Sequence, residues 1–278
     1  MRARIWGARG SLASPGSDTI RYGGNTSCIE LRPEDGSLVV LDAGTGIRKL
    51  GLTLDGSSPQ RIDILLSHLH LDHLEGLGFF APLWEARTEL HIWGPPSPVR
   101  PLSDRIAQYL SPPLFPVRLA DVPARIRLHD APEEPCSLGT ATMRAASIIH
   151  RGPTVGYRIE ERGRVLAYLT DHEPARTAEL SSVPPEWVSG YAIAAGADVL
   201  IHDCQYTDDE YPSRAGFGHS SARHVADFAR LAGVGRLLLF HHDPNHDDQE
   251  LESLRDRVRD LWDGGDVELA REGDELEL

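Results

Sequence analysis

The run SHLHLDH, from Ser67 to His73, places four candidate metal ligands within six residues. It follows the apolar segment Ile62–Leu66, which we expect to be a strand that delivers the cluster at its C-terminal end. Alternate residues of an extended chain point the same way, so His68 and His70 are predicted to face one site. Asp72 and His73 follow as the chain turns. Imidazole together with carboxylate suits zinc, with iron or manganese as less favoured occupants.

The length and charge of the chain limit what surrounds this cluster. At 278 residues the chain is long enough to bury a sizeable core, and we expect a single domain over residues 1–278. The formal net charge is −14. An acidic surface repels a polyanion, so stable nucleic-acid binding is disfavoured, although a local arginine-lined pocket for one phosphate is not.

Cysteine usage and hydropathy indicate a cytoplasmic protein. Cys28, Cys136 and Cys204 are scattered without a CxxC pair, which is typical of reduced thiols. Cys204 lies near the expected site, and packing is favoured over a ligand role. No signal peptide is recognisable, and no apolar run approaches the ~18 residues that suggest a membrane span. The sequence is also compatible with a homodimer.

Hydrophobic patterning predicts short strands in both halves of the chain, with helices between them. The expected strands are Arg2–Trp6, Ser27–Leu31, Ser37–Leu41, Ile62–Leu66, Leu90–Trp93, Arg125–Leu128, Ala141–Ile149, Thr154–Ile159, Val165–Leu169, Val199–His202 and Arg236–Phe240. The expected helices are Ile47–Leu52, Leu102–Leu110, Glu186–Ala195, Ser220–Leu231 and Asp248–Trp262. This fits two sheets packed face to face with helices outside, within an α/β or α+β class. The proline-rich segment 95–116 reads equally as a lid or as a surface connection.

HLHLDH resembles the HxHxDH signature of the metallo-β-lactamase superfamily, which implies a four-layer αββα sandwich. That superfamily completes a two-metal site with a later His, a bridging Asp and a final His, each at a strand end. Here His150 closes a strand in ASIIHRG, Asp171 closes one in AYLTDHEP, and His241 closes one in LLLFHHDP. The resemblance thus extends over almost the whole chain.

The resemblance implies a ligand set for two Zn²⁺ ions, with Mn²⁺ or Fe as other occupants. One metal would take His68, His70 and His150; the other would take Asp72, His73 and His241; Asp171 would bridge them. His241 is preferred to His242 on the analogy and on strand alternation. Asp42, in LDAGTG, resembles the superfamily's first motif, where it would orient a ligand histidine; otherwise it caps the following turn.

The segments AGADVLIHDCQY and GFGHSSARHVADFA resemble the phosphodiesterase branch that includes the tRNA-processing ribonuclease Z. In that branch a carboxylate, here Asp203, supports a histidine, here His219, as general acid or charge stabiliser. Glu is usual at the carboxylate, so the shorter Asp203 leaves this pairing open; His219 otherwise only precedes a helix. The 21 residues from His150 to Asp171 leave room for a two-strand return but not for a long tRNA-binding arm.

The stronger resemblance is to stand-alone bacterial members with WGARGS, RYGGNTSC, GHSS and FHHDP. We therefore expect hydrolysis of a small phosphodiester, of the cyclic nucleotide or cyclic phosphate type, by a metal-bridging hydroxide, with Asp72, His219 and Asp203 in catalysis. Hydrolysis of a carboxylic ester, lactone or thioester is the alternative at the same site, and RNA processing is disfavoured. A metal-dependent nucleotide-binding module is the alternative without catalysis.

A few further residues have two open interpretations. Gly-rich loops carry potential phosphate donors, which turn chemistry explains equally well: Arg9, Arg21, Asn25, Thr26 and Ser27. Arg151 follows a ligand candidate and reads equally as a substrate contact or as a surface ion pair. His91, His129 and His224 are interpreted as non-functional.

Overall fold

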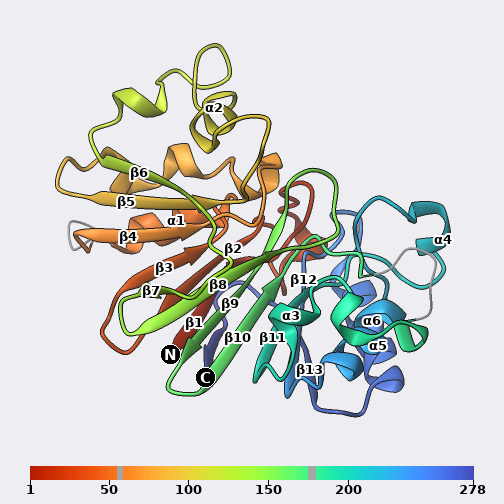
Figure 1. Cartoon of the computed structure of the whole chain (residues 1–278). Helices are drawn as coiled ribbons and strands as arrows, with labels where there is room; N and C mark the ends of the chain where they lie inside the picture. Colours follow the sequence, from red (N-terminus) through yellow and green to blue (C-terminus); the bar gives the residue numbers. More distant parts are fainter. Residues whose placement is uncertain (55–58, 175–179) are drawn as a thin grey trace.

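Two seven-stranded sheets pack face to face, and helices cover their outer sides (Figure 1). The computed structural model describes residues 1–54, 59–174 and 180–278. The strand clusters of the two halves of the sequence form one sheet each, apart from the last strand, which joins the first sheet. The expected αββα sandwich is therefore confirmed.

The first sheet combines an antiparallel edge with a parallel half. Its spatial order is β14 (Glu275–Glu277), β1 (Arg2–Gly7), β2 (Cys28–Arg32), β3 (Leu38–Leu41), β4 (Arg61–Leu65), β5 (Glu89–Gly94) and β6 (Arg125–Asp130). Strands β3 to β6 run parallel, so their carboxyl ends lie at one edge.

The second sheet has the same mixed plan. Its order is β13 (Asp266–Leu269), β12 (Arg236–Phe240), β11 (Val199–Asp203), β10 (Arg164–Leu169), β9 (Val155–Glu161), β8 (Ala141–Ser147) and β7 (Cys136–Leu138). Strands β10 to β13 are parallel, whereas β9 and β10 form the antiparallel two-strand return expected between His150 and Asp171.

Strand alternation divides the apolar side chains among three cores. In β3, Val39 and Leu41 face the core between the sheets, and Val40 faces the outer helices. A strand that is buried on both faces of its sheet has a continuous apolar sequence. This is why β3 has the sequence LVVL and β12 the sequence RLLLF. The helices over the first sheet are α1 (Gly46–Thr53) and α2 (Leu102–Ala107), and those over the second are α3 (Tyr191–Ala194), α5 (Ala222–Ala232) and α6 (Asp248–Leu261).

Local chemistry sets the ends of the two long helices. Ser221 caps α5 and accepts from His224 N, and α5 ends at Gly233, whose φ of 63° is left-handed. Asp247 caps α6 and accepts from the backbone of Gln249 and Glu250. Glu250, three residues after Asp247, accepts a hydrogen bond from the Asp247 backbone, which completes a capping box.

Some sequence expectations about the elements are wrong. The helix expected over Glu186–Ala195 is broken into a 3₁₀ turn at Pro185–Trp187 and the short α3, because Gly190 between them has a φ of 78°. Strands β7, β13 and β14 were not expected. The segment 95–116 buries four side chains in the outer core, which favours a surface connection: Leu102, Ile106, Leu110 and Phe115.

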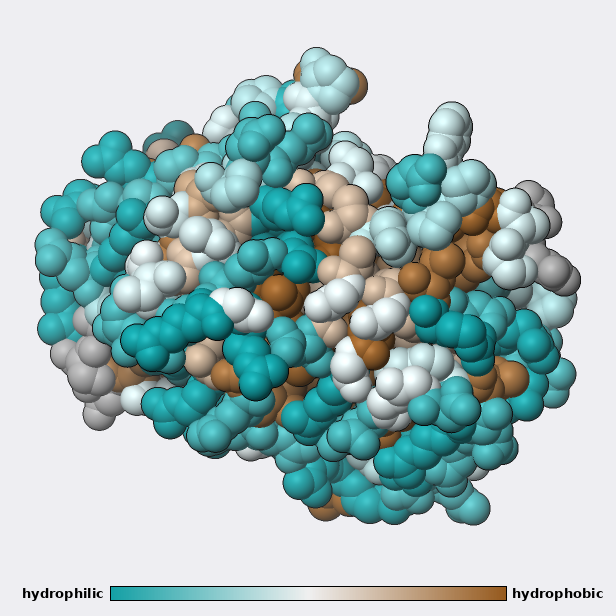
Figure 2. All heavy atoms as spheres, turned by 60° about the horizontal axis from the view of Figure 1, so that its bottom comes forward, coloured by the Kyte–Doolittle hydropathy of each residue, from teal (hydrophilic) through white to brown (hydrophobic). Residues whose placement is uncertain are grey.

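The surface seen in Figure 2 is largely hydrophilic, with hydrophobic residues in separate small areas. This agrees with a chain of net charge −14. None of the described helices combines the length and apolar character that crossing a bilayer requires.

Candidate metal centre

The site lies where the carboxyl ends of strands from both sheets meet. Ser67 and His68 follow β4, Asp171 follows β10, and His241 follows β12 directly. Such edges of parallel strands are where ligands bind in layered α/β folds, because the loops there converge.

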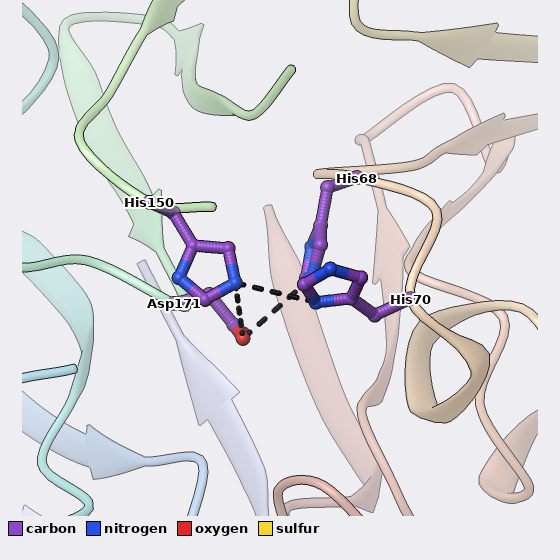
Figure 3. A group of neighbouring side chains, drawn as sticks. All are labelled: His68, His70, His150 and Asp171. Atoms are coloured by element: carbon purple, nitrogen blue, oxygen red, sulfur yellow. Dashed lines mark hydrogen bonds and ion pairs between the residues drawn. The ribbon is translucent and has the colours of Figure 1, made fainter. Parts of the chain in front are cut away.

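The first group of ligand candidates comprises His68, His70, His150 and Asp171 (Figure 3). Asp171 Oδ2 lies 3.6 Å from His68 Nε2 and 3.4 Å from His150 Nε2. His150 Nε2 is 3.3 Å from the ring of His70. Figure 3 shows the imidazoles and the carboxylate pointing into a common space.

The second group comprises Asp72, His73 and His241. The Nε2 atoms of the two histidines are 3.2 Å apart, and each lies 3.1 Å from Asp72 Oδ2. Each also lies 3.0 Å from Asp171 Oδ1. The two oxygens of Asp171 therefore face different groups, Oδ2 the first and Oδ1 the second.

Hydrogen bonds on the far side of the rings fix which nitrogen faces the site. Nδ1 of His73 donates to Asp42 at 2.8 Å, that of His150 to the carbonyl of Gly218 at 2.9 Å, and that of His241 to Gln205 Oε1 at 3.2 Å. In these three rings Nε2 is therefore the nitrogen that faces the site, where it can bind a cation.

His68 shows the same arrangement, with an unpaired inner atom. Ser67 Oγ donates to Asp42 at 2.8 Å and so accepts from His68 Nδ1 at 3.1 Å. His68 Nε2 is buried and has no hydrogen-bond partner among the residues that the structure describes. Leaving such a group unpaired is costly, and a cation in the cluster would satisfy it. The donor set therefore fits divalent metal binding.

Asp42 lies beneath the site and is fully buried. Besides His73, it accepts from the Ser67 backbone at 2.7 Å and from the Tyr168 hydroxyl at 2.7 Å. Its contacts orient a ligand candidate, as the sequence suggested, and do not reduce to capping a turn.

Three site residues have left-handed backbone conformations: φ is 58° at Asp42, 51° at Asp171 and 58° at His241. Non-glycine residues adopt this region uncommonly, and its cost is tolerated mainly at functional sites. Each residue comes within two residues of a strand end, so the turn redirects its side chain into the site.

His219 and Asp203 form a close pair beside the two groups. His219 Nδ1 lies 2.6 Å from Asp203 Oδ2, and Asp203 Oδ1 accepts from the Gln205 and Ser220 backbones at 3.1 Å each. The His219 ring stacks on His241, with centroids 5.1 Å apart. The shorter carboxylate of Asp203 thus reaches its histidine.

The electrostatics of the apo cluster follow from burial and charge. Burial opposes charge on His219, but Asp203 chiefly raises its pKa to about 9. Burial likewise disfavours ionised Asp171, yet His241, His73 and His68 hold its pKa well below the usual range. His68, with burial dominant, has a pKa well below its ordinary value.

Two residues that position the site were not found from the sequence. Gln205 holds His241, and the Ser11 backbone donates to Asp72 Oδ2 at 2.8 Å. Both contacts join segments far apart in the chain, and Ser11 acts through its backbone, so no motif marks it. His242 points away from the site, and its Nε2 lies 2.9 Å from the Ala270 carbonyl.

Several weaker candidates have structural roles. Arg9 is buried and donates to the carbonyls of Gly23, Asp243 and His246. Arg21 pairs with Glu252, and Asn25 donates to Glu272 at 2.9 Å. Cys204 is packed in the core of the second sheet, as favoured.

Comparison with known proteins agrees with this geometry. The family described as "Beta-lactamase superfamily domain" matches residues 38–242, most of the chain. The chain belongs to the metallo-β-lactamase superfamily. Within this superfamily, ribonuclease Z of Brevibacillus brevis is 30% identical over 274 residues, which cover 84% of each chain. This chain is accordingly a ribonuclease Z-like member.

Two solved structures are similar to this chain over nearly their full length. A diphosphatase of the PhnP family has a TM-score of 0.70 at 20% identity, with 100% of this chain and 97% of its own covered. The human tRNase Z short form has a TM-score of 0.67 at 22% identity, with 100% and 99% covered. These likenesses show the shared fold.

Proposed function

We propose that this chain hydrolyses a small phosphodiester, of the cyclic nucleotide or cyclic phosphate type, at a site that holds two zinc ions. The observation that carries the proposal is the placement of Asp171. One of its oxygens faces His68 and His150, and the other faces His73 and His241. A carboxylate shared in this way suits a bridging ligand between two cations.

The two groups of neighbouring side chains would each hold one cation. His68, His70 and His150 would hold one cation, and the second would be held by Asp72, His73 and His241, with Asp171 common to both. When bound, two such cations lower the pKa of water and neutralise the charge that develops on a phosphoryl group. Mn²⁺ or Fe would fit the same nitrogen and oxygen donors.

His219 and Asp203 supply the proton for the leaving oxygen. Nδ1 of His219 is engaged by Asp203, so its Nε2–H is the group free to donate. Burial disfavours a charged His219, and the negative charge of Asp203 counters this, so that the pKa of His219 is raised to about 9 in the apo protein. The alkoxide that leaves a phosphodiester needs such a proton more than the thiolate that leaves a thioester does, because a thiolate is the weaker base.

Two features of the chain favour a small substrate over RNA, and one similarity favours RNA. The interval from His150 to Asp171 is filled by the β9–β10 hairpin, and the net charge is −14. Both disfavour a long polyanion. The curated relative is nevertheless a ribonuclease Z, so precursor tRNA is the second candidate substrate.

The test is turnover of bis(p-nitrophenyl) phosphate by zinc-loaded protein. Asp72→Ala removes a ligand and is expected to reduce kcat/KM by roughly a thousandfold or more. His219→Ala is expected to reduce kcat by about a hundredfold to ten-thousandfold for a phosphodiester with an alkoxide leaving group, and to have less effect on bis(p-nitrophenyl) phosphate, whose leaving group needs no proton. His129→Ala, a histidine stacked on Trp93 outside the site, is the matched control and should retain activity.

Parallel substrates separate the alternatives. A lactone, a thioester, a cyclic nucleotide and a precursor tRNA are assayed with the same preparation. Faster turnover of the lactone or thioester would replace the proposal by carboxylic ester chemistry, and cleavage of the tRNA would favour RNA processing. Tight binding of an unaltered cyclic nucleotide would indicate a binding module. Full activity of both Asp72→Ala and His219→Ala would contradict the mechanism.

A further inference from the structure

A cavity of about 420 Å³ opens directly beside the metal centre. His219 forms part of its wall, so a group bound there would be joined to an atom that His219 protonates. The wall also contains two arginines, each with an aromatic partner: Arg151 with Phe217 and Arg214 with Tyr206. The cavity therefore borders His219 and Gln205, which contact the ligand candidate His241, and its wall carries two arginines and one carboxylate, Asp243.

Both arginines are positioned by contacts of their own. The Arg151 guanidinium lies 5.3 Å from the centre of the Phe217 ring, and its Nε donates to the Gly216 carbonyl at 3.2 Å. Arg214 lies 5.6 Å from the ring of Tyr206. Stacking on a ring orients a guanidinium and leaves its outward N–H groups for a ligand.

The segment that carries Arg214 and Phe217 is anchored from beneath. The buried Glu173, two residues after Asp171, accepts from the Tyr211 hydroxyl at 2.6 Å and from the Gly216 backbone at 2.8 Å. The segment is thus held against the same loop that carries the shared carboxylate. A subsite fixed in this way loses little conformational freedom when it binds a ligand.

In the described part of the chain, Arg151 and Arg214 lie outside ion-pair distance of every carboxylate. The carboxylate that borders the cavity, Asp243, is buried and engaged by Asn245 at 2.8 Å and Gln205 at 3.3 Å. The surface ion pair considered for Arg151 is therefore not what the structure contains.

We propose that Arg151 and Arg214 form a subsite for a second phosphate of the substrate, carried on the leaving side of the scissile phosphodiester. The inference rests on the proposed function and narrows its substrate class to phosphodiesters with two phosphates. Guanidinium forks match phosphate oxygens in geometry and charge. The second phosphate is either a terminal monoester or the next diester of a short chain, and both present the same oxygens.

The experiment compares substrates with and without a second phosphate on the leaving side. A dinucleoside monophosphate has one phosphate, its phosphorylated form adds a terminal monoester on the leaving nucleoside, and a trinucleotide adds the next diester there. We expect zinc-loaded wild-type protein to prefer a two-phosphate compound by about tenfold to a hundredfold in kcat/KM, as charged hydrogen bonds imply. Preference for the monoester or for the trinucleotide identifies the source.

The variants R151Q and R214Q test the residues through this ratio rather than through absolute rates. Each is expected to lower the preference, and the double variant should bring it to about one. Arg48→Gln, an exposed arginine on α1, is the matched control and should keep the wild-type ratio. Calorimetric Kd values for the same compounds give a second readout that needs no turnover.

The outcomes separate the inference from the proposed function. A wild-type ratio near one, or a ratio that survives in the double variant, would overturn the subsite. Failure to hydrolyse bis(p-nitrophenyl) phosphate would instead refute the phosphodiesterase activity, while the ratio of Kd values would still test Arg151 and Arg214.

Discussion

Adjacent histidines and carboxylates on the same strand ends behave in opposite ways. Asp171 and His241 project into the metal centre, whereas their chain neighbours His172 and His242 are fully buried elsewhere. His172 is 2.9 Å from His202 and 3.1 Å from Ser189, which satisfies both its ring nitrogens. Proximity to a motif therefore does not make a ligand; the direction imposed by the backbone does.

The residues of the metal centre also differ in electrostatics from the histidines buried outside it. Carboxylates face every histidine of the second ligand group, and despite burial they raise the pKa of His73 well above its usual value. For the histidines buried outside the metal centre, burial dominates: it lowers the pKa of His202 to about 4 and that of His242 to about 3. The first environment suits a cation; the second suits neutral rings that serve as fixed hydrogen-bond partners.

The largest expected effect comes from comparing a substitution in the metal centre with one at its buried chain neighbour. Asp171→Asn removes the charge shared by both groups and should reduce kcat/KM for bis(p-nitrophenyl) phosphate by roughly a thousandfold or more. His172→Gln touches no ligand directly and should cost about tenfold or less. Steady-state kinetics on zinc-loaded proteins measures both. Equal losses of kcat/KM in the two variants would contradict the distinction between residues of the metal centre and their buried neighbours.

A smaller effect concerns the pH dependence of stability. His202 and His242 have pKa values in the folded protein below the ordinary value of about 6.5, so below that pH the unfolded chain takes up protons that the folded chain does not. Their contribution is present above pH 6.5 and is lost as the pH falls towards 4 for His202 and 3 for His242. Each histidine removes about 1.4 kcal/mol of stability per pH unit in that window.

Urea unfolding of metal-free protein between pH 7 and pH 5 measures this loss. His242→Asn should unfold with a shallower dependence on pH than wild type, because one neutral buried ring has been removed. Other titrating groups are common to both proteins and cancel in the comparison. Parallel pH profiles would show that His242 is not held neutral in the folded state.

Much of the fold and of the candidate site could be predicted because the signals are local. The run from His68 to His73 and the apolar strands before Asp171 and His241 are contiguous in sequence. The left-handed turn at each strand end is what directs the side chain inward, and no residue type announces it at Asp171 or His241. This is why strand alternation alone separated His241 from His242 only weakly.

What could not be predicted depends on contacts between distant segments. The hydrogen bond from Gln205 to Asp243, the one from Tyr168 to Asp42, and the pairing of the polar β14 with β1 each join residues that have no common motif. The helix expected over Glu186–Ala195 failed for a local reason, since Gly190 adopts a left-handed conformation that ends the periodic pattern.

The proposed function requires one carboxylate, Asp171, to be shared by two metal ions. The most direct test is the metal content of zinc-saturated protein after removal of free ions, with anomalous diffraction locating the bound zinc. We predict two zinc ions per chain, one beside each oxygen of Asp171, with His242 contacting neither. A single zinc ion per chain, or zinc bound away from Asp171, would contradict the account.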